Sequence, residues 1–152
     1  VYVTVGGDIW WGKEEAWLQC IDPSGEGDIT KTGLVWSYPV EKHCCATPSV
    51  YDGKVFVADS GGFVHCVNAA DGKPWWRHEV GGEVWASTLV ADGKVYVPTR
   101  RRNLAVFAAE KEEKLLTTIQ LDSAMNGSAT AANGVLYITT MRKLYAASVG
   151  GR

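Results

Sequence analysis

Short apolar runs rich in β-branched and aromatic residues recur along this chain, each directly after a turn dipeptide. Asp52-Gly53 precedes the run 55–57, Asp92-Gly93 precedes 95–97, and Asn133-Gly134 precedes 135–138. Asp-Gly and Asn-Gly supply the left-handed backbone that a two-residue hairpin turn requires. Val, Ile, Tyr and Phe fit the pleated surface of a sheet. The pattern therefore predicts a series of β-hairpins and no helices.

These hairpins repeat at a nearly constant interval. Asp52 and Asp92 are 40 residues apart, and Asp92 and Asn133 are 41 residues apart. A period near 40 built from short strands and tight turns is typical of a β-propeller blade. Because one twisted sheet cannot bury both of its faces alone, such sheets stack around a common axis. The predicted fold class is all-β, a β-propeller of four-stranded blades.

The repeat divides the chain into units at about 1–40, 41–80, 81–121 and 122–152. The first unit lacks an opening strand and the fourth lacks a closing one, so we expect about fourteen strands, or roughly three and a half blades. The N-terminus begins inside a strand pattern and is interpreted as a cut. Completing the ring then needs another polypeptide or a second copy of this chain.

Composition adds few constraints. The formal net charge of −2 gives no reason to expect nucleic-acid binding. No apolar run approaches the roughly 20 residues of a membrane-spanning helix. Cys20 and Cys66 occupy equivalent places in their units, where a small packing residue is expected. Trp36 and Trp76 are 40 residues apart, which predicts an aromatic ring wedged between neighbouring blades.

The segment from Cys66 to Trp76, with its Asn-Ala-Ala-Asp-Gly-Lys core, closely resembles the repeat of the pyrroloquinoline-quinone (PQQ) type of β-propeller. This resemblance implies a ring of about eight blades, of which the chain looks like the C-terminal half. It also implies a bacterial protein of the periplasm or cell envelope. Some members of the family are quinoprotein dehydrogenases that bind PQQ with calcium. Others, including a scaffold of outer-membrane barrel assembly, bind no quinone.

Three residues with the repeat spacing define a candidate ligand site. Cys45, Trp85 and Asn126 each stand just before an inner strand and are expected to converge at one mouth of the channel, close to His43 and Cys44. They are either ligand-binding residues or ordinary loop residues. In quinoprotein alcohol dehydrogenases of the family an adjacent Cys-Cys disulfide covers the quinone. Here Cys44 and Cys45 are expected as two separate thiols, because the ring of an adjacent disulfide is strained.

Three other stretches leave alternatives open. Trp10, Trp11 and Trp17 form either a surface for a protein partner or a hairpin whose rings fold back over the blade. The acidic stretch 22–33 faintly resembles a calcium loop but lacks the closing Glu, so a solvated turn is favoured. The hairpin Arg100-Arg101-Arg102 could bind an anion, and a solvated turn is again the simpler reading.

No catalytic residues and no protein metal site are predicted, because catalytic triads, phosphate loops and paired-cysteine spacings are absent from the sequence. The predicted function is a non-catalytic propeller acting as a binding or protein-interaction scaffold, with no cofactor. The alternative is part of a PQQ-dependent alcohol dehydrogenase, with the quinone on the propeller axis and calcium beside it.

Overall fold

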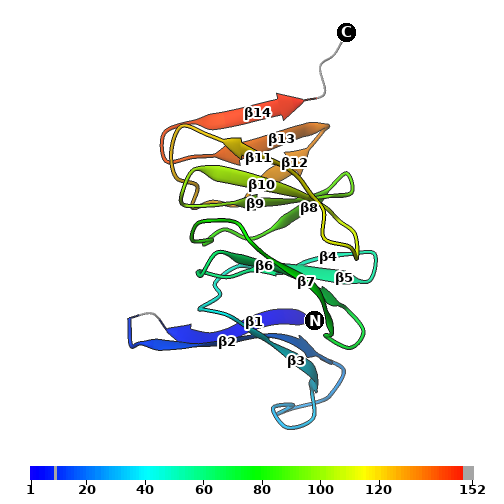
Figure 1. Cartoon of the computed structure of the whole chain (residues 1–152). Coiled ribbons are helices and arrows are strands. Elements are labelled where there is room, and N and C mark those ends of the chain that lie inside the picture. Colours follow the sequence, from blue (N-terminus) through cyan, green and yellow to red (C-terminus); the bar gives the residue numbers. More distant parts are fainter. Residues whose placement is uncertain (9, 149–152) are drawn as a thin grey trace.

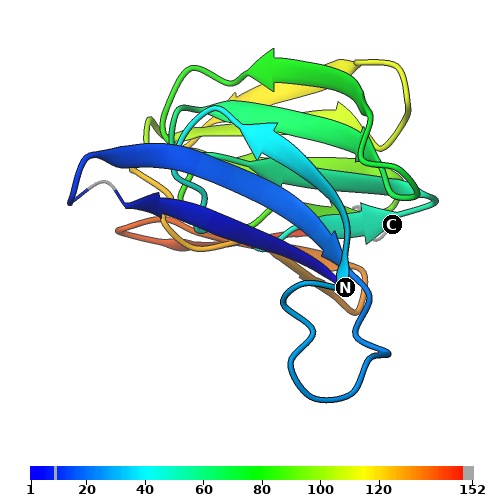
Figure 2. The same ribbon diagram turned by 90° about the horizontal axis from the view of Figure 1, so that it is seen from below.

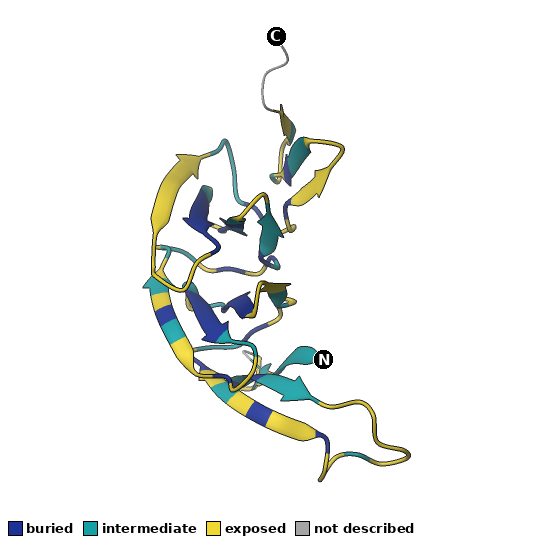
Figure 3. Cartoon of the chain, turned by 90° about the vertical axis from the view of Figure 1, so that its right-hand side faces the viewer, coloured by how far each residue is buried: buried dark blue, intermediate teal, exposed yellow. Residues whose placement is uncertain are grey.

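A computed structural model describes residues 1–8 and 10–148. Within these residues the chain forms four antiparallel sheets and no helix, and therefore no helix that could span a membrane. The sheets lie one above another in an open arc (Figures 1 and 3). The all-β propeller-blade architecture predicted from the sequence is confirmed.

Each of the four predicted units contains one sheet. The first sheet consists of β1 (Tyr2–Asp8), β2 (Lys13–Ile21) and β3 (Leu34–Val40). The second consists of β4 (Ser49–Tyr51), β5 (Lys54–Ala58), β6 (Phe63–Asn68) and β7 (Pro74–Glu79). The third consists of β8 (Leu89–Ala91), β9 (Lys94–Pro98), β10 (Asn103–Ala108) and β11 (Leu115–Gln120). The fourth consists of β12 (Thr130–Ala132), β13 (Val135–Thr139) and β14 (Leu144–Ser148).

The two complete sheets share one register. Val50 pairs with Val55 across the β4–β5 turn, and Val90 pairs with Val95 across the β8–β9 turn. Asp52 and Gly53 both have positive φ, 45° and 71°, as the mirror-image hairpin turn demands. The aspartate also bonds to the lysine that follows the turn, with Lys54 Nζ 2.8 Å from Asp52 Oδ2. The Asp-Gly signal therefore placed these turns correctly.

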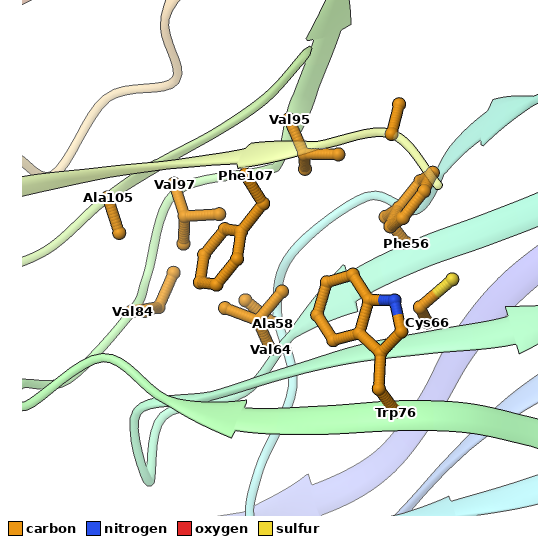
Figure 4. Packing of buried hydrophobic residues seen from close by; sticks show 11 residues of the cluster. Phe56, Ala58, Val64, Cys66, Trp76, Val84, Val95, Val97, Ala105 and Phe107 are labelled. Atoms are coloured by element: carbon orange, nitrogen blue, oxygen red, sulfur yellow. The ribbon is translucent and has the colours of Figure 1, made fainter. Parts of the chain in front are cut away.

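Apolar side chains from facing sheets fill the space between the sheets. Between the second and third sheets, Trp76 stacks on Phe107 with ring centroids 5.4 Å apart and also contacts Phe56 (Figure 4). Its indole Nε1 donates a hydrogen bond of 3.1 Å to the carbonyl of Glu110 in the third sheet's unit. Trp36 makes the equivalent bond of 3.1 Å to the Ala69 carbonyl. The predicted wedging of tryptophans between blades is confirmed.

A buried polar chain also joins the first two sheets. Asp59 and His65 are almost fully buried, with relative exposures of 0% and 1%. His65 Nε2 lies 3.1 Å from Asp59 Oδ2, and His65 Nδ1 lies 3.0 Å from the Tyr38 hydroxyl on β3. Asp59 Oδ2 further accepts a bond of 3.0 Å from the backbone N–H of Glu41. The network fixes the chain where it passes from the first sheet to the second.

The cysteines at the repeat position pack as predicted. Cys20 pairs with Trp36 across β2 and β3, and Cys66 pairs with Trp76 across β6 and β7. Cys66 is buried, and desolvation raises the pKa of its thiol to about 12. This thiol is therefore a packing group that stays protonated.

The first hairpin has long strands. β1 continues through Gly6 and Gly7 to Asp8, and β2 already begins at Lys13. Gly6 and Gly7 do not end the strand, because they take positive φ values of 83° and 76° and form a bulge inside the pairing. Bulges of this kind bend a strand without ending it. The result is a hairpin that reaches further than its counterparts (Figure 1).

Candidate functional site

One end of the stack collects two kinds of loop, and we call it the loop face. It comprises the hairpins β1–β2, β5–β6, β9–β10 and β13–β14, together with the connections between sheets at 41–48, 80–88 and 121–129. Strand direction alternates within each sheet, so these loops must lie at the same end. Figure 2 shows the β1–β2 hairpin at this end and the loop between β2 and β3 at the opposite end. All five predicted ligand-site residues belong to the loop face.

A repeated backbone hydrogen bond holds each connection to the hairpin beside it. The donor is the backbone N–H of the second residue after β5, β9 or β13, and the acceptor is a backbone carbonyl in the connection that precedes that sheet. The three bonds, each of 2.9 Å, run from Ser60 N to His43 O, from Arg100 N to Glu83 O and from Met141 N to Ala124 O. The loop face is therefore a set of equivalent backbone positions that carry different side chains.

Two of the three repeat-spaced candidates lie together. Cys45 Sγ is 3.5 Å from the backbone carbonyl of Trp85, and both residues are exposed. Further along, Thr47 N donates to Ser87 Oγ at 2.8 Å, which aligns the two connections. The side-chain amide nitrogen of Asn126 instead lies 3.4 Å from Sδ of Met141, which is in the β13–β14 hairpin of the same unit. Residues at the repeat spacing are thus in contact for Cys45 and Trp85, whereas Asn126 contacts a residue of its own unit.

The side chains of His43 and Cys44 contact other parts of the chain and do not join Cys45 and Trp85. His43 Nδ1 lies 3.0 Å from the carbonyl of Gly7 on β1. Cys44 is buried, and its Sγ lies 3.1 Å from the carbonyl of Ala58. Desolvation raises the pKa of the Cys44 thiol to about 11, so the thiol stays protonated at neutral pH. Cys44 and the exposed Cys45 are two free thiols facing different neighbours.

Sequence reasoning missed the contacts that fix Trp85. The Arg100 guanidinium lies over the Trp85 ring, 4.6 Å from its centroid. The same guanidinium is 2.7 Å from Glu83 Oε2. An arginine that stacks on an indole and pairs with a carboxylate holds both in place. Nothing in the spacing reveals this, because Trp85 and Arg100 belong to different loops of the same unit.

The tryptophans near the N-terminus do not act as one group. Trp10 and Trp11 stand at the tip of the β1–β2 hairpin with exposures of 86% and 81%. Their backbone N–H groups donate to Asp8 Oδ1 at 3.0 and 3.3 Å, which orders the turn. Trp17 lies on β2 and is half-buried against Gly6. The reading in which the rings fold back over the blade is therefore wrong for Trp10 and Trp11.

The acidic stretch after β2 forms a turn. Asp22 Oδ1 accepts from the Ser24 N–H and Asp28 Oδ1 from the Thr30 N–H, both at 2.9 Å. The backbone bond from Ser24 holds the pKa of the Asp22 carboxyl below its usual range, and the Thr30 hydroxyl, followed by the Thr30 N–H, does the same for Asp28. Among residues 1–8 and 10–148, no three His, Cys, Asp or Glu side chains come close enough to hold a metal ion.

Similar solved structures share this architecture. The chain is similar to BamB from Moraxella catarrhalis (17% identity, TM-score 0.68), covering 90% of this chain and 43% of that one. It is also similar to a quinohemoprotein alcohol dehydrogenase from Pseudomonas putida HK5 (24% identity, TM-score 0.63), covering 70% of this chain and 18% of that one. A computationally designed protein, Ika4, gives a TM-score of 0.66 at 12% identity and covers 90% of this chain and 81% of that one. These likenesses concern the fold.

The chain spans less than half the length of the natural proteins it resembles. No curated protein sequence matches it. A family model described as outer membrane protein assembly factor BamB matches residues 15–146, which is most of the chain. The repeated hairpins, the inter-sheet tryptophans and this match agree, and the chain belongs to the PQQ-repeat family of the outer membrane protein assembly factor BamB.

Proposed function

We propose that this chain is part of a non-catalytic propeller scaffold that binds another protein in the bacterial cell envelope. Membership of the BamB family supports the envelope location and the assembly role. The observation that carries the proposal is the pair of exposed indoles, Trp10 and Trp11, on the hairpin that projects from the loop face.

Exposed tryptophan pairs are unfavourable in water and are enriched at the energetic centres of protein interfaces. Here the pair sits on an ordered support. Asp8 caps the turn, and Lys42 in the first connection forms an ion pair with Glu14 on β2. Contacts that hold a hairpin in one conformation before binding reduce the conformational freedom lost on binding, so more of its contact energy remains as affinity. A partner with an apolar cleft bordered by charged groups fits this tip.

The scaffold also needs the rest of its ring. The first and fourth sheets have three strands, and β1 and β14 each present an open edge. Open strand edges are normally paired or covered. We propose that the ring is completed by further blades, from elsewhere in the same protein, from another polypeptide or from a second copy of this chain. Light scattering on the purified chain tests the last of these, because only self-completion gives a particle of twice the monomer mass.

The runner-up, a quinoprotein dehydrogenase, has the propeller fold in its favour. Among the described residues no three His, Cys, Asp or Glu side chains come together, and Cys44 is buried whereas Cys45 is exposed, so nothing in the loop face specifically favours this alternative. We therefore propose no catalytic chemistry for the loop face. Adding PQQ and calcium to the chain and following quinone absorbance and dye reduction tests this directly, and dye reduction would reject the non-catalytic assignment.

The scaffold proposal is tested by mixing the chain with solubilised envelope proteins and identifying the retained partner by mass. The double variant Trp10→Ala/Trp11→Ala is expected to fold normally and to lose the partner. The matched control is Leu34→Ala, another exposed apolar residue at the opposite end of the molecule, which should retain it. Equal retention by the double variant and the control would remove the basis of the proposal.

A further inference from the structure

A basic pocket lies on the loop face between the third and fourth sheets. It has a volume of about 460 Å³ and is open to solvent. Its walls come from the β9–β10 hairpin, the third connection and the β13–β14 hairpin. The residues that matter for its chemistry are Arg101, Arg102, Asp122, Ser123 and Arg142. We call this the arginine pocket.

The charges of the arginine pocket are not balanced from within. Arg100, at its border, is paired with Glu83. Among the residues that the structure describes, no carboxylate lies within 4.0 Å of Arg101, Arg102 or Arg142. Asp122 is the single acidic side chain of the lining, and its Oδ1 already accepts 2.9 Å from Thr140 Oγ1. Three guanidinium groups therefore face one carboxylate.

The arginine pocket also contains an unsatisfied hydroxyl. Ser123 Oγ is buried and has no hydrogen-bond partner, the single side-chain atom of this kind in the described part of the chain. Buried polar atoms are almost always paired, so an orphan requires a reason. The exposed arginine side chains around it are long and rotate at little cost. Because Ser123 also lines the arginine pocket, its Oγ is placed to become a donor if these side chains rearrange around a bound group.

Arg102 occupies a place that glycine takes in the preceding unit. Its φ is 70°, and Gly62, at the same place in the β5–β6 hairpin, has φ 88°. Both carbonyls accept the same 2.8 Å bond, from Leu121 N and from Val80 N respectively. A left-handed backbone is strained for arginine and is free of that strain for glycine. Strained non-glycine residues of this kind concentrate at functional sites.

We propose that the arginine pocket binds a phosphate-type oxyanion through Arg101, Arg102 and Arg142, with Ser123 Oγ as a further donor. A carboxylate offers two oxygens, whereas three guanidinium forks and a hydroxyl supply more donors than two oxygens accept. A tetrahedral phosphoryl group presents three or four oxygens and suits this set. Its source is either free inorganic phosphate or the phosphate of a lipid headgroup.

The first test titrates the whole chain with inorganic phosphate at low ionic strength by calorimetry. Saturable binding is expected, weakened at least about tenfold by Arg102→Gly and by Arg142→Gln, since each removes a charge-assisted contact. Arg102→Gly should fold normally because glycine is native to the equivalent position. Lys31→Ala removes the same charge from an exposed loop at the other end of the molecule and should bind as the parent does.

Ser123→Ala gives a second readout. It should leave the melting temperature unchanged or raised, because it removes a buried unsatisfied hydroxyl, and it should still weaken phosphate binding. A structural role for Ser123 would give the opposite pattern, a lower melting temperature with unchanged affinity. That pattern would remove Ser123 from the proposed site.

Vesicles then distinguish the two sources. Binding to phosphatidylcholine vesicles containing phosphatidic acid, competed by free phosphate, assigns a lipid headgroup, whereas phosphate binding without vesicle binding assigns the free ion. The proposal is overturned if phosphate shows no saturable binding, or if Arg102→Gly and Arg142→Gln bind it as Lys31→Ala does. No partner protein enters the assay, so this outcome is independent of the scaffold role.

Discussion

Replacing Trp76 with alanine should loosen the joint between the second and third sheets. The indole is 7% exposed and lies between Phe56 on its own sheet and Phe107 on the next. Its Nε1 also donates to the Glu110 carbonyl across the joint at 3.1 Å. Trp76→Ala removes the apolar contact and the hydrogen bond together, and leaves a cavity where two sheets meet.

Several contributions set the size of the effect. Truncation of a buried tryptophan in a core costs about 3–5 kcal/mol, including the cavity. Trp76→Phe keeps a ring in place and loses the indole donor, so we expect about 1–2 kcal/mol. In a chain of this length each kcal/mol lowers the melting temperature by roughly 2–4 °C. Trp76→Ala should therefore melt about 10 °C below the parent, and Trp76→Phe only a few degrees below it.

Urea unfolding followed by far-UV circular dichroism measures both variants, since tryptophan fluorescence changes with the substitution itself. The matched control is Trp75→Ala, which removes the same side chain from the neighbouring position on β7. Trp75 is half-buried at the edge of the same apolar cluster, with the Lys111 ammonium 5.1 Å from its ring centroid, so a smaller loss of roughly 1–2 kcal/mol is expected. Equal losses for Trp76→Ala and Trp75→Ala would refute the idea that the inter-sheet ring holds the stack together.

Three further outcomes follow from the packing. Gly62→Ala should lower the stability of the folded chain more than Gly53→Ala. Both positions have positive φ, but a Cβ at Gly62 would lie 2.6 Å from a backbone carbonyl oxygen, whereas a Cβ at Gly53 would meet nothing within 4 Å. The melting temperatures of the two variants test this. Asp59→Ala should cost about 3–5 kcal/mol in urea unfolding, because it leaves buried donors without an acceptor; a loss below about 1 kcal/mol would show that the network is not needed. The raised thiol pKa values of Cys44, about 11, and Cys66, about 12, favour the folded state below pH 9, and this stability is lost as the pH rises from 9 through those values. The free energy of unfolding should fall by up to about 1.4 kcal/mol per pH unit for each thiol in this range. A Cys44→Ala variant whose free energy of unfolding falls as steeply with pH as that of the parent would contradict this.

The repeat made most of the fold predictable from the sequence. Asp52-Gly53 and its equivalents fix where each hairpin turns, because few other dipeptides accept two consecutive left-handed residues. The spacing of Trp36 and Trp76 identified the inter-sheet rings, because a residue repeated at the blade period must meet the same neighbour in each unit. Features that depend on local backbone geometry, or on the length of the repeat, can therefore be predicted reliably from the sequence.

The β1–β2 hairpin was harder to predict for a physical reason. A Gly-Gly pair normally favours a turn, so Gly6-Gly7 gives no sign in the sequence that the strand continues. The structure keeps the pair within the strand, where the backbone of His43 lies against it: a Cβ at Gly7 would be 2.7 Å from His43 Cα. The glycines are therefore explained by a close approach of another segment, which sequence order does not show.

The sequence predicted where the candidate-site residues lie in the fold, but it did not predict which side chains they contact. Repeat spacing placed Cys45 beside Trp85, yet it gave no sign that Arg100 stacks on the indole or that Cys44 turns into the core. Equivalent backbone positions follow from the period. Side-chain contacts depend on which residues the neighbouring loops happen to carry, and these differ from unit to unit.

The loop face keeps the same backbone arrangement in each unit while its side chains differ. The same backbone bond is formed by His43, Glu83 and Ala124, so its geometry does not depend on the side chain present. Each unit can therefore carry different chemistry at a fixed place without disturbing the sheets. In this chain the aromatic tip belongs to the first sheet, whereas the arginine pocket lies between the third and fourth. Substitutions at Trp10 and Arg102 should consequently act independently, and a double variant should lose protein binding and phosphate binding by the same factors as the single variants.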